Sequence, residues 1–188
     1  NFKRFRDVMR SYGERDTKGV EHARWRDINA NRTSQVESFA IVRNPWSKVV
    51  SRYLFAKQAV QRNLLKPDYA NTNSLDAFIE ERHKWIDKDL TWYRAIRGWH
   101  PQMDHVTDTA GNVKCDILRL EHLNTDAEKY FGIEEMPRAR NVTSIKENYK
   151  DLYNPVTIQI IADWYKKDID HWGFDFDTSA TKNYWNMK

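Results

Sequence analysis

The sequence predicts an α/β domain in which helices cover a parallel sheet. Three observations support this: a short apolar run at 37–42, a helical pattern directly after it, and a second apolar run, "CDILRL", followed by further helical patterns. Strands that alternate with helices are typical of layered α/β domains. The 188 residues suit a single domain, 1–188. A chain of this length can bury about 70% of the surface that its unfolded form exposes.

The start of the chain is predicted to be helical. Gly13 ends a helical pattern of apolar residues that consists of Phe2, Phe5, Val8, Met9 and Tyr12. The sequence begins at Asn1 without a methionine and enters this pattern at once. We therefore expect the domain to be truncated at its N-terminus, with a segment upstream of Asn1 missing.

The first predicted strand is the apolar run "ESFAIV" at 37–42. A short, continuous apolar run is typical of a strand that is covered on both faces in a parallel sheet. Asn44 is a suitable N-cap, and Pro45 a suitable first residue, for a helix that follows directly. The apolar stripe of that helix is formed by Trp46, Val49, Val50, Tyr53 and Leu54.

Further helical patterns occupy much of the remaining chain. Ser74 is predicted to cap one helix, and the stretch "DLTWYRAIRGW" is predicted to form another. The stretch "NTDAEKYFG" predicts a short helix closed by Gly132. The clearest pattern has Asn154 as its N-cap and Pro155 at its first position, and it continues to Gly173.

The second predicted strand lies in the middle of the chain. Two β-prone segments flank the turn-rich residues 108–112, which indicates a hairpin or a strand that returns to the sheet. The stretch "CDILRL" that follows is predicted to be a core strand. Cys115, the single cysteine, lies in this apolar run, so we expect a buried thiol and not a nucleophile or a metal ligand.

The composition excludes several classes of protein. Apolar residues make up 40% of the chain and charged residues 31%, which excludes wholesale disorder. The net charge of +4 favours an anionic partner weakly and does not indicate nucleic-acid binding. No apolar stretch reaches the roughly twenty residues of a membrane span, and no signal peptide opens the chain. We therefore expect no membrane association of this segment and take a cytoplasmic location as the default.

The residues at the end of the first strand predict an anion-binding site. Ligands of α/β sheets bind at the carboxyl ends of the strands, where a helix start offers free N–H groups and about half a positive charge. Arg43 lies at this point, and its planar guanidinium can bind two phosphate oxygens. Ser51, about two turns into the helix, can add a hydroxyl if the ligand lies along that helix.

The alternative is that this arginine is a surface residue at a turn and that the serine is merely tolerated in the helix. Lys48 and Arg52 flank the motif and could widen the positive field. At their spacing, however, a solvated helix face is the expected arrangement.

The stretch "RNPWSKVVS", with its serine eight residues after the arginine, resembles the 3′-phosphate-binding motif of a known enzyme family. That family is the sulfotransferases that use 3′-phosphoadenosine 5′-phosphosulfate (PAPS). Four other stretches are similar, in order, to carbohydrate-type and bacterial members: "HARWRDI", "HPQMDHVTDTAGNVKCDILRLEHL", "ARNVTS" and "YKDLYNPVTIQIIADWYKKDIDHWGFDF". The resemblance implies a P-loop-like α/β sheet flanked by helices, with Arg43 and Ser51 bound to the 3′-phosphate of the donor.

The resemblance also implies roles for residues outside this motif. His22 lies shortly before the first strand, where related sugar sulfotransferases have their general base, and an imidazole can accept a proton at neutral pH. Asn141 and Ser144 correspond to a loop that faces the nucleotide, although a polar loop before a helix explains them equally well. Glu121 resembles a residue that orders the site; its alternative is a strand-end carboxylate paired with Arg119.

One part of the family pattern is missing from the sequence. The family neutralises the leaving group with a lysine-containing loop after its first strand, and no Lys-Thr-x-x-Ser/Thr pattern or Gly-rich loop opens this chain. We expect that loop to belong to the missing upstream segment. The implied chemistry requires no metal ion, and we find no convincing ligand cluster.

The leading hypothesis is therefore a PAPS-dependent sulfotransferase that transfers a sulfuryl group to an acceptor hydroxyl, with a carbohydrate as the expected acceptor. The alternative is a non-catalytic module of the same fold that binds a nucleotide or an acidic ligand. A nucleic-acid-binding protein would fit the sequence pI of 9.1 and the aromatic content, but the phosphate site at the strand end argues against it. The identity of the acceptor and the oligomeric state stay open.

Overall fold

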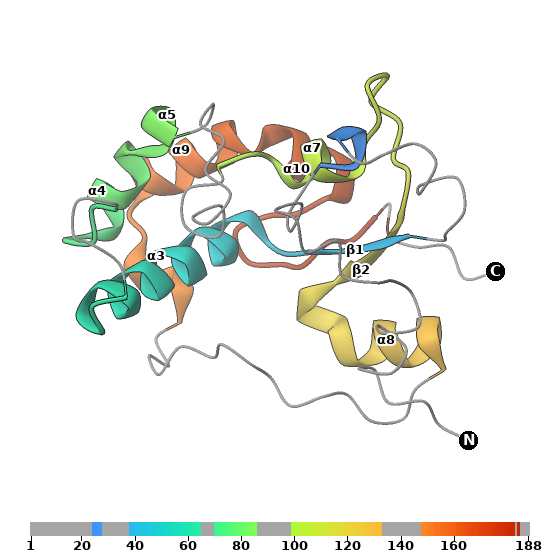
Figure 1. Cartoon of the computed structure of the whole chain (residues 1–188), viewed down its shortest axis with the longest axis horizontal. Coiled ribbons are helices and arrows are strands. Elements are labelled where there is room, and N and C mark those ends of the chain that lie inside the picture. Colours follow the sequence, from blue (N-terminus) through green and yellow to red (C-terminus); the bar gives the residue numbers. More distant parts are fainter. Residues whose placement is uncertain are drawn as a thin grey trace.

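The structure of the whole chain is a computed structural model (Figure 1). The residues that the structure describes are 24–27, 38–64, 70–85, 99–132, 148–182 and 184. The helices predicted before Gly13 and in "DLTWYRAIRGW" lie outside these residues, apart from Trp99.

A parallel pair of strands joins two distant parts of the chain. Strand β1 (Phe39–Val42) pairs with strand β2 (Asp116–Arg119), and Phe39 lies opposite Asp116 in the register. Both strands and their parallel pairing are as the sequence predicts. Within the described residues the sheet has two strands. The expectation that both faces of β1 are covered holds for Val42, which is 1% exposed, but not for Ile41, which is 41% exposed.

Two residues, Arg43 and Asn44, separate β1 from helix α3 (Pro45–Gln61). Asn44 is its N-cap, Pro45 its first residue, and the whole predicted apolar stripe is buried, which confirms this part of the prediction. The stripe packs against α4 (Leu75–Glu80), which Ser74 caps as predicted, and against α9 (Pro155–Trp164). The 3-10 helix η5 (Tyr149–Leu152) also contacts α3.

The segment before the Asp108 turn is a helix and not a strand. Residues of the first predicted β-prone segment form α7 (Gln102–Val106), and only an isolated bridge between Thr107 and Val113 has the expected antiparallel pairing. The carboxylate of Asp168 accepts hydrogen bonds from the first two amides of α7. A tertiary contact that the local sequence does not encode therefore stabilises this short helix.

Helices on two sides enclose the strand pair. Figure 1 shows α8 (Leu123–Phe131) below the strands in this view, and α7 and α10 (Lys166–Trp172) above them. Gly132 ends α8 and Gly173 ends α10, both in the left-handed conformation predicted for a C-terminal glycine. The long C-terminal helix of the prediction is divided at Tyr165, where the backbone leaves helical geometry (φ −105°, ψ 25°).

Three smaller elements complete the described structure, and each lies beside a helix already named. The 3-10 helix η1 (Trp25–Asp27) contacts α7, and α5 (Arg82–Trp85) contacts α4. The 3-10 helix η4 (Leu120–His122) connects β2 to α8.

One hydrophobic core connects α3 to the helices around it. Its largest fully buried side chains include Trp99, Trp172, Tyr165 and Phe78. Cys115 packs on this core and is half-buried, and burial raises the pKa of its thiol to about 12. The described residues thus form a mixed α/β structure that is mostly helical, with a small parallel sheet.

The described residues contain neither a candidate membrane-spanning helix nor a candidate metal-binding cluster. None of their helices is both long and apolar enough to cross a lipid bilayer. In the same part of the chain, no three His, Cys, Asp or Glu side chains gather closely enough to hold a metal ion.

Candidate functional site

Arg43 occupies the carboxyl end of β1, where the chain turns into α3. Its side chain is half-buried, and Nε donates a hydrogen bond of 2.9 Å to the Ser47 hydroxyl. Burial lowers the pKa of the guanidinium, whereas the charge of Glu121 raises it. An arginine stays protonated in proteins despite such a shift. The two terminal nitrogens bond to no residue in the described part of the chain, so they can bind an anion.

Ser51 lies one turn beyond Ser47, the partner of Arg43, on α3. Ser47 and Ser51 are four residues apart in α3, a spacing that places their side chains on one helix face, and Arg43, which precedes the N-cap Asn44, is linked to this face by its bond to Ser47. Ser51 is half-buried, whereas Ser47 is buried and contacts the guanidinium directly. Ser47 is a residue that the sequence analysis missed, although its i, i+4 spacing from Arg43 was available as a signal.

The helix N-terminus does not offer free amides, contrary to the sequence-based expectation. Pro45 has no N–H, and the amides of Trp46 and Ser47 donate to the Asn44 side-chain oxygen. The Lys48 amide donates to the backbone oxygen of Asn44 at 2.8 Å. An anion at this site is therefore expected to bind side chains along α3 and not the first turn of the helix.

Asn44 also ties the junction to two other segments. Its side-chain nitrogen donates to the backbone oxygens of Asp175 and Thr178, at 2.7 and 2.8 Å. The backbone N–H of Asn44 donates to a carboxylate oxygen of Glu121 at 2.8 Å. Asn44 is 2% exposed, so these bonds connect the strand end to the C-terminal segment inside the protein.

Glu121 is not paired with Arg119, which corrects one of the two readings of this carboxylate. The partner of Arg119 is Asp126, through bonds of 2.9 Å from Nε and 2.6 Å from Nη2. Glu121 instead holds the backbone of Asn44 and raises the pKa of the neighbouring Arg43. It therefore orders the junction between β1 and α3.

Lys48 and Arg52 do not lie on a solvated helix face. The Arg52 side chain is 8% exposed, and its guanidinium lies 4.5 Å from the centre of the Trp99 ring. The Lys48 ammonium lies 4.7 Å from the centre of the Tyr165 ring and donates to the His100 backbone oxygen at 3.2 Å. These cations are packed against aromatic rings, an arrangement that the helical spacing alone did not reveal.

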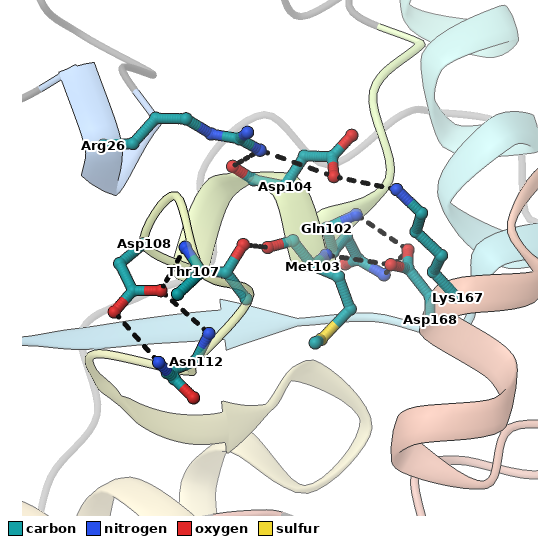
Figure 2. Close-up of polar contacts among 10 residues, drawn as sticks. Arg26, Gln102, Met103, Asp104, Thr107, Asp108, Asn112, Lys167 and Asp168 are labelled. Carbon is teal, nitrogen blue, oxygen red and sulfur yellow. Dashed lines mark hydrogen bonds and ion pairs between the residues drawn. The ribbon is translucent and has the colours of Figure 1, made fainter.

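Gln102 fixes the backbone of the candidate anion ligand. The Arg43 N–H donates to the Gln102 side-chain oxygen at 2.8 Å, and the Gln102 side-chain nitrogen donates to the Arg43 backbone oxygen at 2.8 Å. Gln102 in turn contacts Asp168, as Figure 2 shows. Nothing in the local sequence links Gln102 to Arg43, because they are 59 residues apart.

The three other predicted site residues, His22, Asn141 and Ser144, lie outside the described residues. The nearest described element after His22 is η1, whose Arg26 contacts Asp104 of α7 (Figure 2). The Arg26 guanidinium donates to the Asp104 backbone oxygen at 3.3 Å and lies 3.5 Å from its carboxylate. The segment that follows His22 is thus attached to the helix that carries Gln102.

Comparison with known proteins gave no match to a family model, to a curated protein or to a solved structure.

Proposed function

We propose that the protein is a sulfotransferase that transfers a sulfuryl group from PAPS to an acceptor hydroxyl, with a carbohydrate as the acceptor. Arg43 and Ser51 bind the 3′-phosphate of the donor. The observation that carries this proposal is the position of Arg43 at the carboxyl end of a parallel strand, with Nε bonded to Ser47 and no hydrogen bond from its terminal nitrogens to a described residue.

The donor set fits a phosphate. A guanidinium binds two phosphate oxygens through parallel N–H donors, and charge-assisted bonds of this kind contribute about 1.5 to 3 kcal/mol each. The Ser51 hydroxyl, one turn beyond Ser47 on the same face, supplies a further donor. Because the first amides of α3 are already bonded to Asn44, the phosphate in this proposal lies beside the side chains of Arg43 and Ser51 and not at the amides of the helix N-terminus.

The β1–β2 pair with α3 directly after β1 supports the finer proposal of a P-loop-like sheet flanked by helices. In this arrangement the nucleotide binds across the carboxyl ends of the strands. Asn141 and Ser144 contact the nucleotide from a neighbouring loop in our proposal.

His22 is the proposed general base. When bound, the donor supplies the sulfuryl group and a phosphate leaving group. The imidazole of His22 accepts the proton of the acceptor hydroxyl, since its ordinary pKa near 6.5 leaves it unprotonated at neutral pH. Arg43 and Ser51 hold the donor in place while this proton moves, and positioning of this kind accounts for much of the catalysis in related phosphoryl transfers.

Calorimetry with adenosine 3′,5′-bisphosphate tests the binding part of this proposal. The chain should bind the bisphosphate more tightly than adenosine 5′-phosphate, because only the former carries the 3′-phosphate. Arg43→Ala should weaken the bisphosphate complex by at least about tenfold and leave the 5′-phosphate complex unchanged. Arg62→Ala is a matched control, since Arg62 is an exposed arginine at the other end of α3. Equal losses for Arg43→Ala and Arg62→Ala would contradict the proposed phosphate site.

A transfer assay with radiolabelled PAPS and a panel of hydroxyl-bearing sugars tests the chemistry. His22→Ala should retain bisphosphate binding and abolish transfer. A protein that also carries the expected lysine-containing loop, and that binds the bisphosphate but sulfates no acceptor, would favour a non-catalytic binding module of the same fold. Binding to nucleic acid that falls steeply with salt, together with indifference to the bisphosphate, would overturn both.

A further inference from the structure

Arg43 is held through its backbone as well as through its side chain. Both of its main-chain polar groups are bonded to the side-chain amide of Gln102, each at 2.8 Å. In a sheet, a neighbouring strand would normally pair with these groups. Here the Gln102 side chain takes the place of that strand at Arg43, the residue directly after β1. It therefore fixes the backbone from which the guanidinium extends.

Only one orientation of the Gln102 amide satisfies all of its neighbours. Its oxygen must face the Arg43 N–H, and its nitrogen must face both the Arg43 backbone oxygen and the Asp168 carboxylate, 3.2 Å away. Turning the amide over would place acceptors against acceptors. The hydrogen bonds therefore lock the amide in a single position.

Asp168, a residue of α10, holds the Gln102 amide in this orientation. Its side chain is fully buried (0% exposed) and accepts hydrogen bonds from the backbone amides of Gln102 and Met103, at 2.8 and 2.9 Å (Figure 2). Burial raises the pKa of this carboxyl, whereas Lys48 of α3 lowers it. The carboxylate thus joins α10 to α7.

We propose that Gln102 and Asp168 are positioning residues that hold the Arg43 backbone in place and thereby set the affinity for the 3′-phosphate. The effect on affinity rests on the proposed function, whereas the effect on the Arg43 backbone does not. Ordering the guanidinium before the ligand arrives removes an entropic cost of binding. A shift of about 1 Å in a positioning group can cost as much as about a hundredfold in activity, so a loose Arg43 backbone should be detectable.

Gln102→Glu is the decisive variant. It preserves the shape of the side chain but replaces the nitrogen donor by a second oxygen, which then faces the Arg43 oxygen and the Asp168 carboxylate. Calorimetry should show at least about a tenfold loss of affinity for adenosine 3′,5′-bisphosphate and no change for adenosine 5′-phosphate. Gln159→Glu is the matched control, because Gln159 also donates to an aspartate, Asp163, but on an exposed face of α9.

A double-mutant cycle separates positioning from general damage. In the Arg43→Ala background, Gln102→Glu should cause no further loss of bisphosphate affinity, because the group it positions is already absent. A further loss of the same size, or an equal loss for adenosine 5′-phosphate, would overturn the proposal. Gln102→Met and Asp168→Asn provide variants without the added charge, and they should show the same dependence on Arg43.

A ligand-free measurement keeps this inference independent of the proposed function. Hydrogen exchange of the Arg43 amide, followed by NMR, should be slow in the wild type and faster in Gln102→Met, while amides in the centre of α3 keep their protection. If the wild type binds no bisphosphate, the proposed function fails, and this exchange experiment still decides the positioning role. Unchanged protection of the Arg43 amide in Gln102→Met would overturn it.

Discussion

Glu121 accepts a hydrogen bond from the backbone N–H of Asn44 at 2.8 Å, so the ends of the two parallel strands are joined beyond the last pair of the sheet. The same carboxylate is the main negative charge that acts on the guanidinium of Arg43. Glu121 therefore has two effects, one on the backbone of the junction and one on the charge of the candidate phosphate site.

Two substitutions at Glu121 should separate these effects. Glu121→Ala leaves the buried Asn44 N–H without its acceptor and should cost about 1 kcal/mol in the free energy of unfolding, because Glu121 itself is exposed. Glu121→Gln keeps the acceptor and should retain wild-type stability. It also removes a negative charge near Arg43, so bisphosphate affinity should rise by up to about fivefold. Urea denaturation and calorimetry measure the two quantities.

The opposite pattern, in which Glu121→Gln loses stability and gains no affinity, would show that the negative charge itself holds the junction together.

Asn44 should contribute strongly to stability, because its side chain serves the helix and the C-terminal segment together. Asn44→Ala removes the N-cap of α3 and the bonds to Asp175 and Thr178, and should cost about 2 to 4 kcal/mol. Asn44→Ser keeps a capping oxygen and loses the donors to Asp175 and Thr178 without adding a charge, so its unfolding free energy should be intermediate. Hydrogen exchange of residues 173–180 should accelerate in both variants. If Asn44→Ser were as stable as the wild type, the bonds to the C-terminal segment would contribute little.

The elements that the sequence predicted correctly are those whose causes are local. Asn44 and Asn154 cap helices with a proline at the first position, and Gly132 and Gly173 end helices in the left-handed conformation. A cap or a terminal glycine acts within one turn, so a short window of sequence contains the whole signal. The strand pair was also predicted from its apolar runs, although the exposure of Ile41 was not.

The elements that the sequence predicted wrongly depend on distant contacts. Helix α7 was expected to be β-structure, and its first amides are bonded to Asp168, which is 66 residues from Gln102. The environment of Lys48 likewise depends on His100 and Tyr165, which no helical spacing relates to it. Arg43 and Ser51 could be selected from the sequence because a short motif contains both. Gln102 could not, because only the fold brings it to the strand end.

The ion pair between Arg119 and Asp126 should stabilise the fold at neutral pH. Asp126 is 2% exposed and also accepts a bond from the Arg119 backbone N–H at 2.9 Å. Asp126→Asn should therefore cost about 2 to 4 kcal/mol at pH 7, since it leaves a partly buried guanidinium without its counter-charge. Asp170→Asn is the control: Asp170 pairs with Lys166 on an exposed face and should change stability by less than about 0.5 kcal/mol.

The cost of Asp126→Asn should depend on pH in a defined direction. Burial acts to raise the pKa of Asp126, but the bonds from Arg119 outweigh it, and the pKa lies below its ordinary value of 3.8. A carboxyl with a lowered pKa stabilises the fold above pH 3.8, and this contribution is lost as the pH falls through the pKa of the folded state. The difference between wild type and Asp126→Asn should therefore shrink below about pH 4. A difference that stays constant down to pH 2 would contradict the assigned ion pair.

The titration of Lys48 should be visible at alkaline pH. Burial lowers the pKa of its ammonium from 10.5 to about 8, against the opposing effect of Asp168. Between pH 8 and 10.5 the unfolded chain keeps this proton while the folded chain has released it, so Lys48 makes the free energy of unfolding rise with pH. The slope for one proton is at most about 1.4 kcal/mol per pH unit.

Lys48→Met removes this titration. As the pH rises from 8 to 9.5, the free energy of unfolding of the wild type should therefore increase relative to that of the variant. Urea denaturation at a series of pH values measures the difference. Tyr165 and Tyr153 do not interfere in this range, because burial raises the pKa of each above the ordinary value of 10. Lys167→Met, at an exposed lysine of α10, is the control and should show no such trend. A pH-independent difference for Lys48→Met would mean that the ammonium is hydrated in solution and is not desolvated by its position against the Tyr165 ring.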